Sequence, residues 1–176
     1  MSSVRDRVND GLYAAGWAIV RRGPERLMAL VFRALADAVW QRRGPAVQRL
    51  EANLRRVVGD DPATLRATSR AGLRSYARYW LDLFRLPVWS DARVLSSTHF
   101  DGTEPFLTMR AQGRGAVLVL PHMANWDSAG AWLVKSGHPF TTVAERLKPE
   151  SLFDRFAAFR ESLGMEVLAA SGGERS

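Results

Sequence analysis

One stretch, from Gly115 to Asp127, constrains the fold of this sequence more than any other. It begins with an apolar run, Ala116 to Leu120, whose continuous Val and Leu content is typical of a strand covered on both faces. A helical pattern begins at Asn125. The stretch therefore predicts a buried strand, then a turn that holds His122 and Asp127, then a helix. In open α/β sheets such a turn lies at the carboxyl edge of the sheet, where ligands bind.

Length and cysteine content narrow the class of protein. A chain of 176 residues with 47% hydrophobic content suits one domain, or one domain with an added helical segment. The absence of cysteine excludes disulfides, thiolate metal sites and catalysis by a cysteine. The apolar runs are much shorter than the roughly 20 residues of a membrane span, so no transmembrane helix is expected. Asp6 and Asp10 precede the first apolar run, which is the wrong charge order for a signal peptide.

The positive charge is concentrated in the N-terminal half. Residues 1–100 hold 17 Arg, no Lys and 9 acidic residues, a balance of +8, whereas the remainder has 8 basic and 9 acidic residues, a balance of −1. A basic half indicates nucleic acid or an anionic lipid surface as a partner, or solvated helix faces with no partner at all. The sequence has no helix-turn-helix, zinc-finger or RNA-recognition signature, which disfavours nucleic acid.

Residues 1–90 are predicted to form four helices. Gly23-Pro24, Gly44-Pro45 and Asp61-Pro62 break the chain, and each Pro suits a first helical position. Arginine and aromatic residues occur together in this part, a combination typical of helices that lie at a membrane interface. We therefore expect a helical, membrane-associating segment, although most of its aromatic rings are expected in the core. The helices are predicted over Val4–Val20, from Pro24 to Arg43, from Pro45 to Val58 and over Pro62–Arg85.

Residues 91–176 show alternating strand and helix patterns. Such alternation requires crossover connections and predicts an α/β fold with a mainly parallel sheet. With about four strands, the last would be an uncovered edge, so we expect a truncated first part of a longer α/β domain. The expected strands are Val94–Phe100, Ala116–Leu120, Phe140–Ala144 and Met165–Ala169, and the expected helices are Thr103–Ala111, Trp126–Val134 and Pro149–Leu163.

His122 and Asp127 form the candidate catalytic pair. Five residues apart, they would lie on different sides of a continuous helix, so the pair is meaningful only across a turn. There the carboxylate can accept from one imidazole nitrogen, and the other nitrogen can take a proton from a substrate hydroxyl. A loop histidine bonded to the backbone is the alternative, because chance alone supplies such a spacing often. The sequence has no Gly-x-Ser-x-Gly elbow and no H-E-x-x-H motif.

The sequence around this pair resembles a known family. The segment His122-Met-Ala-Asn-Trp-Asp127, after Gly-Arg-Gly-Ala-Val-Leu-Val-Leu, is similar to the HxxxxD-type glycerolipid acyltransferases, and its Asn-Trp filling to the lipid A biosynthesis acyltransferase branch. Two further segments, Val143 to Pro149 and Phe159 to Leu168, resemble the mycobacterial phosphatidylinositol mannoside acyltransferases. The resemblance covers essentially the whole chain, whereas family members are nearly twice as long.

The resemblance implies a reaction and a set of site residues. The reaction is transfer of a fatty acyl group, palmitoyl in the closest members, from acyl-CoA to a mannose hydroxyl of a phosphatidylinositol mannoside. His122 would be the general base, and Asp127 would hold its tautomer. Glu145 and Arg160 match family positions associated with the active site. The substrate-binding residues implied in this way are Glu145, Arg160, Asn125 and Trp126.

The resemblance also implies the partners. Acyl-CoA is the donor substrate, and neither a cofactor nor a metal is expected. The other partners are the phosphatidylinositol mannoside acceptor and an anionic membrane surface, with no nucleic acid. We expect a monomer bound peripherally to the cytoplasmic face of the plasma membrane. The alternatives are a non-catalytic lipid-binding fragment, or an acyltransferase that acts on another glycolipid or on a lysophospholipid.

Overall fold

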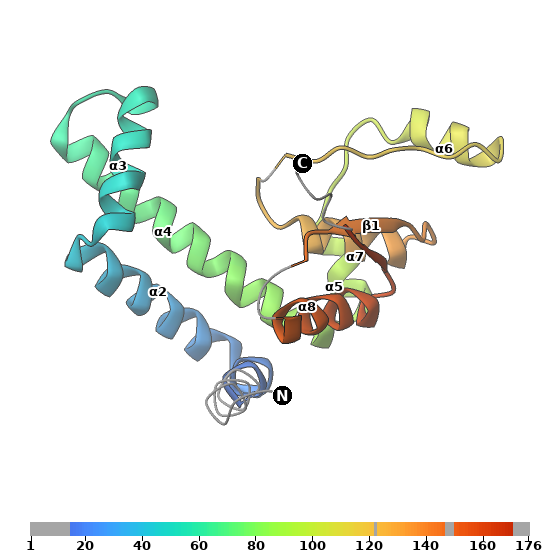
Figure 1. Cartoon of the computed structure of the whole chain (residues 1–176), viewed down its shortest axis with the longest axis horizontal. Helices are drawn as coiled ribbons and strands as arrows, with labels where there is room; N and C mark the ends of the chain where they lie inside the picture. Colours follow the sequence, from blue (N-terminus) through green and yellow to red (C-terminus); the bar gives the residue numbers. More distant parts are fainter. Residues whose placement is uncertain (1–14, 122, 147–149, 171–176) are drawn as a thin grey trace, which may run out of the picture. The chain divides into compact units, whose positions relative to one another are not determined.

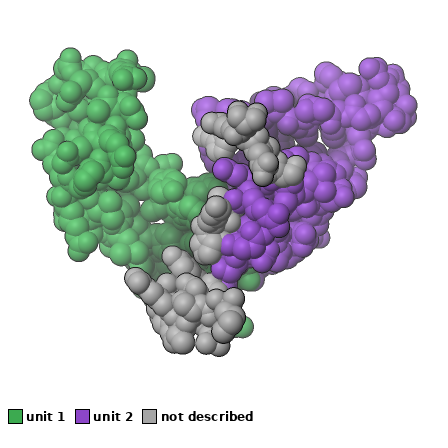
Figure 2. Space-filling view, in the orientation of Figure 1, with its two compact units in different colours: residues 1–85 green, residues 86–176 purple. Residues whose placement is uncertain are grey.

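The protein consists mostly of helices, in two compact units. The structure is a computed structural model that describes residues 15–121, 123–146 and 150–170. Unit 1 is Met1–Arg85 and unit 2 is Leu86–Ser176. Figure 1 shows the elements, and Figure 2 colours the two units. None of the helices in the described ranges is long and apolar enough to cross a membrane.

Unit 1 is built from helices that pack along one long helix. Residues 15–22 are helical, and α2 (Glu25–Arg42), α3 (Pro45–Val58) and α4 (Pro62–Arg85) follow. Both α2 and α3 pack against α4. The predicted helices are confirmed, with residues 4–14 of the first one outside the described residues. The buried apolar side chains of this unit are Met28, Ala36, Val47, Leu65, Leu81 and Leu83.

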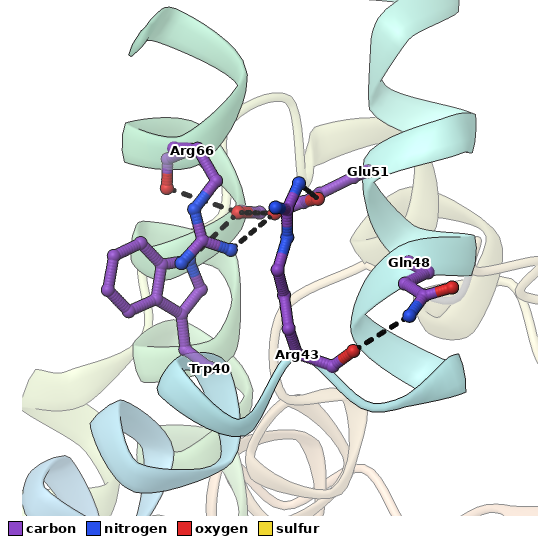
Figure 3. A network of polar contacts seen from close by, with 6 residues as sticks. Trp40, Arg43, Gln48, Glu51 and Arg66 are labelled. Carbon is purple, nitrogen blue, oxygen red and sulfur yellow. Dashed lines mark hydrogen bonds and ion pairs between the residues drawn. The ribbon is translucent and has the colours of Figure 1, made fainter. Parts of the chain in front are cut away.

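A buried carboxylate ties α2, α3 and α4 together. Glu51 on α3 is 5% exposed, and it accepts from Arg66 at 2.7 Å, Ser69 at 3.1 Å and Arg43 at 3.3 Å. Figure 3 shows how the Arg66 guanidinium also lies over the Trp40 ring, 3.6 Å from its centre. Burial by itself raises the pKa of Glu51, but these hydrogen bonds outweigh it and leave that pKa below its ordinary value. The negative charge is therefore fully compensated.

Unit 2 contains a small parallel sheet. Its elements are η1 (Leu86–Val88), α5 (Asp91–Ser97), α6 (Glu104–Ala111), α7 (Trp126–Lys135), β1 (Thr141–Ala144), α8 (Glu150–Ser162) and β2 (Glu166–Ala169). Strands β1 and β2 pair in parallel, with Val143 opposite Leu168, and α8 connects them. The parallel βαβ arrangement that the sequence predicts is thus present as one pair of strands, while helices dominate the described part of the chain.

Two predicted strands are absent from the described residues. The first, Ala116–Leu120, has no regular secondary structure, and Val117 and Val119 are 91% and 86% exposed. A strand needs a hydrogen-bonded neighbour, and no described strand pairs with this run. The second, Val94–Phe100, is largely helix α5, because the Ser90 side chain accepts from the backbone N–H of Arg93 and so caps a helix there. Capping and the burial of Val94 outweigh β propensity.

Helix α7 sits close to the start of β2. A Cβ added at Gly130 would lie 2.7 Å from Met165 Cε and 3.0 Å from Phe140 Cζ, so the helix approaches these side chains only because position 130 lacks one. Gly164, with φ +88°, ends α8 in a conformation that favours glycine. A Cβ at Gly164 would also lie 2.7 Å from Val134 Cγ1 on α7, so the close approaches at both glycines fix the position of α7, whose first turn carries Asp127.

Candidate active site

The first turn of α7 positions Asp127. Asn125 is the residue before the helix, and its Oδ1 accepts from the backbone N–H of Ser128 at 3.1 Å. Ala124 has φ +52°, a left-handed conformation that is uncommon for a residue with a side chain. Asparagine capping and this sharp turn start the helix at Trp126, which places Asp127 at the second helical position. The predicted helix Trp126–Val134 is confirmed.

Asp127 is a buried acid with an arginine partner. It is 1% exposed, and its Oδ1 accepts from Nε of Arg160 at 3.0 Å. Arg160 lies in the last turn of α8 with 12% of its side chain exposed, and its guanidinium lies 4.2 Å from the centre of the Trp126 ring. The other carboxylate oxygen, Oδ2, is buried and has no hydrogen-bond partner among the described residues.

The electrostatic environment of Asp127 is unusual for an acid in an ion pair. Burial raises the pKa of the Asp127 carboxyl above its ordinary value, and the charge and hydrogen bond of Arg160 offset only part of that rise. A carboxylate with one oxygen held and one oxygen open can accept a further hydrogen bond, for example from an imidazole N–H. The arrangement is therefore suited to orient a histidine and to stabilise its charged form.

The other predicted site residues fall in different settings. His122 lies outside the described residues. Glu145 directly follows β1, is exposed and forms no ion pair within the described ranges. Arg160 donates to Asp127. Asn125 caps α7 through its oxygen, and its buried Nδ2 has no described partner.

The sequence did not reveal the contact between Asp127 and Arg160. The two residues are 33 positions apart and belong to different helices. One signal was present in the sequence. Arg160 shares a helical face with Phe156 and Leu163, and an arginine on an apolar face requires a partner. Of the described residues, no group of three or more His, Cys, Asp or Glu is arranged to hold a metal ion.

Comparison with known proteins finds relatives whose names describe acyltransferases. A phosphatidylinositol mannoside acyltransferase of Mycolicibacterium smegmatis is 50% identical over 96% of this chain, and the chain covers 55% of that protein. Two phosphatidylinositol mannoside acyltransferases of Mycobacterium tuberculosis, from strains CDC 1551 and H37Rv, are each 46% identical over 99% of the chain, with 55% of their own length covered. The chain thus spans about half the length of these curated relatives.

The family itself is identified by a match that runs along nearly all of the sequence. Residues 3–175 match the family described as bacterial lipid A biosynthesis acyltransferase. That range includes the first turn of α7 and the last turn of α8, which carry Asp127 and Arg160. The chain therefore belongs to the bacterial lipid A biosynthesis acyltransferase family.

Proposed function

We propose that this chain belongs to a membrane-associated enzyme that transfers a fatty acyl group from acyl-CoA to a mannose hydroxyl of a phosphatidylinositol mannoside. Family membership and the names of the relatives support the reaction class and the acceptor. The observation that carries the chemistry is the buried Asp127 carboxylate with one oxygen open. Such a group is costly to bury without a second donor, which a catalytic histidine would supply.

The proposed reaction is a direct transfer. His122 takes the proton of the mannose hydroxyl, and the oxygen attacks the thioester carbonyl carbon of acyl-CoA. The tetrahedral intermediate collapses, the carbon–sulfur bond breaks, and the thiolate of CoA leaves with the proton from the imidazolium. Asp127 accepts the other imidazole N–H, which fixes the tautomer and stabilises the positive ring. Backbone N–H groups at the start of α7 are the proposed donors to the oxyanion.

Three further residues have proposed substrate-binding roles. Glu145 is an exposed carboxylate just after β1, which suits it to accept hydrogen bonds from sugar hydroxyls. The free Nδ2 of Asn125 is a donor at the entrance to α7. Trp126 is half-buried and offers an apolar ring beside Asp127. These residues come from two segments of unit 2, so an acceptor that contacts them would lie next to the carboxylate.

The outer face of α2 supports the membrane association. Leu27, Leu30, Val31 and Leu35 are between 40% and 64% exposed, and they form a stripe without charged residues along one side of the helix. A helix that is apolar on its outer as well as its inner side must be covered by another apolar phase. Beside the stripe, a groove of about 540 Å³ between α2 and α4 is lined by four arginines, Arg26, Arg33, Arg74 and Arg78. Arg74 and Arg78 already pair with Asp37 and Asp82, so Arg26 and Arg33 are the groove cations that would meet anionic headgroups while the aliphatic side chains enter the acyl region.

The catalytic part of the proposal is tested with acyl transfer. We expect the chain to move a palmitoyl group from palmitoyl-CoA to a phosphatidylinositol mannoside in vesicles, and His122→Ala to reduce the rate at least ~100-fold. The matched control is His99→Ala, because His99 is exposed and its imidazole contacts Asp101. Undiminished transfer by the His122→Ala protein would remove this histidine from the mechanism.

A second candidate function is lipid binding without catalysis. The exposed run of residues 117–120 favours it, because the segment that leads into the turn is not held by a sheet in the described structure. In that case the chain would bind anionic vesicles but transfer no acyl group from palmitoyl-CoA. The same transfer assay, with vesicle binding measured in parallel, distinguishes the two functions.

Membrane association is tested by vesicle flotation. We expect Leu30→Ser combined with Leu35→Ser to weaken binding to vesicles that contain anionic phospholipid, and higher salt to weaken the binding of the unmodified chain. Val57→Ser on α3 is the matched control, since Val57 is 84% exposed but does not belong to the α2 stripe. Equal loss in both variants would exclude α2 as the docking face.

A further inference from the structure

Two contacts of different kinds hold Arg160 inside unit 2. The Nε atom lies 3.0 Å from Oδ1 of Asp127, and the guanidinium carbon lies 4.2 Å from the centre of the Trp126 ring. The ring covers one face of the planar group, and the carboxylate binds its edge. A guanidinium bound in both ways has little rotational freedom, and a lysine could reproduce the charge but not the stacking. Both partners lie in the first turn of α7, so Arg160 fixes this turn from α8.

The surroundings of the pair are apolar. Around Arg160, three apolar side chains that are close to it in sequence are buried, namely Phe159, Leu163 and Met165. On α7, Ala131 and Leu133 are buried. The other described ion pairs of these helices lie elsewhere, because Lys135 pairs with Asp91 and Arg146 with Glu150. Arg160 is therefore the one described charge that compensates Asp127. Removing one member of such a buried pair leaves the other uncompensated.

The contact engages only one oxygen of the carboxylate. Arginine and carboxylate groups often form two parallel hydrogen bonds, which would occupy both oxygens. Here Nε holds Oδ1, and Oδ2 has no partner among the described residues. Arg160 thus fixes the carboxylate and leaves Oδ2 able to accept a further hydrogen bond.

We infer that Arg160 is a positioning residue that holds Asp127 in its charged form and in one orientation, and that it does not bind substrate. The inference rests on the proposed function, in which Asp127 accepts an imidazole N–H from His122. A protonated carboxyl accepts such a bond poorly and cannot stabilise an imidazolium. Burial already raises the pKa of Asp127, so loss of Arg160 raises it further and the acid takes up its proton at a higher pH than in the unmodified chain. Arg160 acts on the reaction through Asp127.

The stability of the chain tests this role without any activity. We expect Arg160→Gln to lower the Tm by roughly 5–10 °C at pH 8, because Asp127 is then ionised and uncompensated. At pH 5 the loss shrinks, because a larger fraction of Asp127 is protonated in the variant than at pH 8. In Asp127→Asn/Arg160→Gln the additional effect of the arginine change disappears at both pH values. Arg110→Gln, at an exposed arginine in the last turn of α6, is the matched control and leaves the Tm unchanged.

The pH profile of acyl transfer tests the role in catalysis. For Arg160→Gln we expect the acid limb of kcat to move up by at least ~1 pH unit, with activity partly restored at higher pH and KM for both substrates within about twofold. Arg160→Lys keeps the charge and shows a smaller shift. If transfer is absent from the unmodified chain, the proposed function fails, while the thermal data still decide the role of Arg160. A loss of Tm that is equal at pH 5 and pH 8, or a rise in KM that does not depend on pH, would overturn the inference.

Discussion

Among the residues that the structure describes, each unit of the molecule contains one buried acid, and the two acids differ in how completely they are satisfied. Glu51 in unit 1 is 5% exposed and accepts from two arginines and a serine. Asp127 in unit 2 is 1% exposed, accepts from one arginine at one oxygen, and keeps the other oxygen without a described partner. Accordingly, the pKa of Glu51 lies below its ordinary value and that of Asp127 lies above it.

The comparison shows that burial alone does not mark a functional acid. Glu51 joins three helices, and all of its acceptor capacity is directed to that structural task (Figure 3). Asp127 is buried more deeply but retains an unused acceptor, at a cost that the fold must offset elsewhere. Functional sites commonly contain such incompletely satisfied groups, since a substrate or a catalytic partner completes them.

The largest difference between the two acids should appear in catalysis. We expect Asp127→Asn to reduce acyl transfer by about 10²–10⁴-fold, because an amide can hold the imidazole in the wrong tautomer and cannot stabilise its charge. Glu51→Gln should leave the rate per folded molecule within about twofold, because Glu51 lies in the other unit. Transfer rates measured under identical vesicle conditions check both. Equal rates for Asp127→Asn and the unmodified chain would contradict a catalytic role for Asp127.

Stability should show the second largest difference. We expect Glu51→Gln to lower the free energy of unfolding by about 1–3 kcal/mol at neutral pH, since it removes the charge that compensates Arg66 and Arg43. The cost stays moderate because the Arg43 side chain is 62% exposed and remains solvated. Chemical denaturation followed by circular dichroism measures it. Arg110→Gln serves again as the control, and a loss no greater than in that variant would contradict the structural role of Glu51.

The dependence of stability on pH should have opposite signs for the two acids. The folded pKa of Glu51 is depressed, so its contribution is present above its unfolded value of 4.5 and is lost as the pH falls through the folded value. The folded pKa of Asp127 is raised, so ionisation of this group costs the folded state stability as the pH rises from 3.8 through the folded value. Relative to the unmodified chain, Glu51→Gln should therefore recover on acidification, whereas Asp127→Asn should gain as the pH rises. Parallel curves for the two variants would be inconsistent with this account.

The smallest expected effect concerns the backbone that leads to Asp127. Ala124 has φ +52°, so Ala124→Gly should stabilise the chain by about 0.5–1 kcal/mol, because glycine adopts this conformation without strain. Ala129→Gly, within α7, is the matched control and should destabilise the chain by about 1 kcal/mol. Thermal unfolding of the two variants measures both changes in stability. A destabilised Ala124→Gly variant would show that the side chain at position 124 has a packing role that outweighs the relief of strain.

The sequence predicted local structure well and spatial partners poorly. The helices of unit 1 could be predicted because proline and glycine mark their ends, and β1, β2 and α8 could be predicted from hydrophobic patterns. The run Ala116–Leu120 has the apolar pattern of a strand. A strand forms only when a second strand pairs with it, and the pattern of one segment does not show whether that second strand is present. The predicted strand from Val94 is wrong because the Ser90 cap starts a helix that outweighs the β propensity of this segment.

The candidate site was predicted in the same uneven way. Asp127 could be chosen from the residues of one short segment, because the strand-like run and the helix pattern bracket it. The ion pair with Arg160 could not, since it joins residues of two helices and depends on how α7 and α8 pack around Gly130 and Gly164. The assignment of Arg160 to substrate binding came from the family resemblance, and the geometry favours a different role.

The most direct test of the central claim is a site-resolved titration of the two acids, by carbon NMR of the Glu51 and Asp127 carboxyl groups in the same sample. The account predicts that the pKa of Glu51 lies below 4.5 and that of Asp127 lies above 3.8, with the Asp127 value rising further in Arg160→Gln. Asp127 titrating at or below 3.8, or showing no response to the loss of Arg160, would contradict the account.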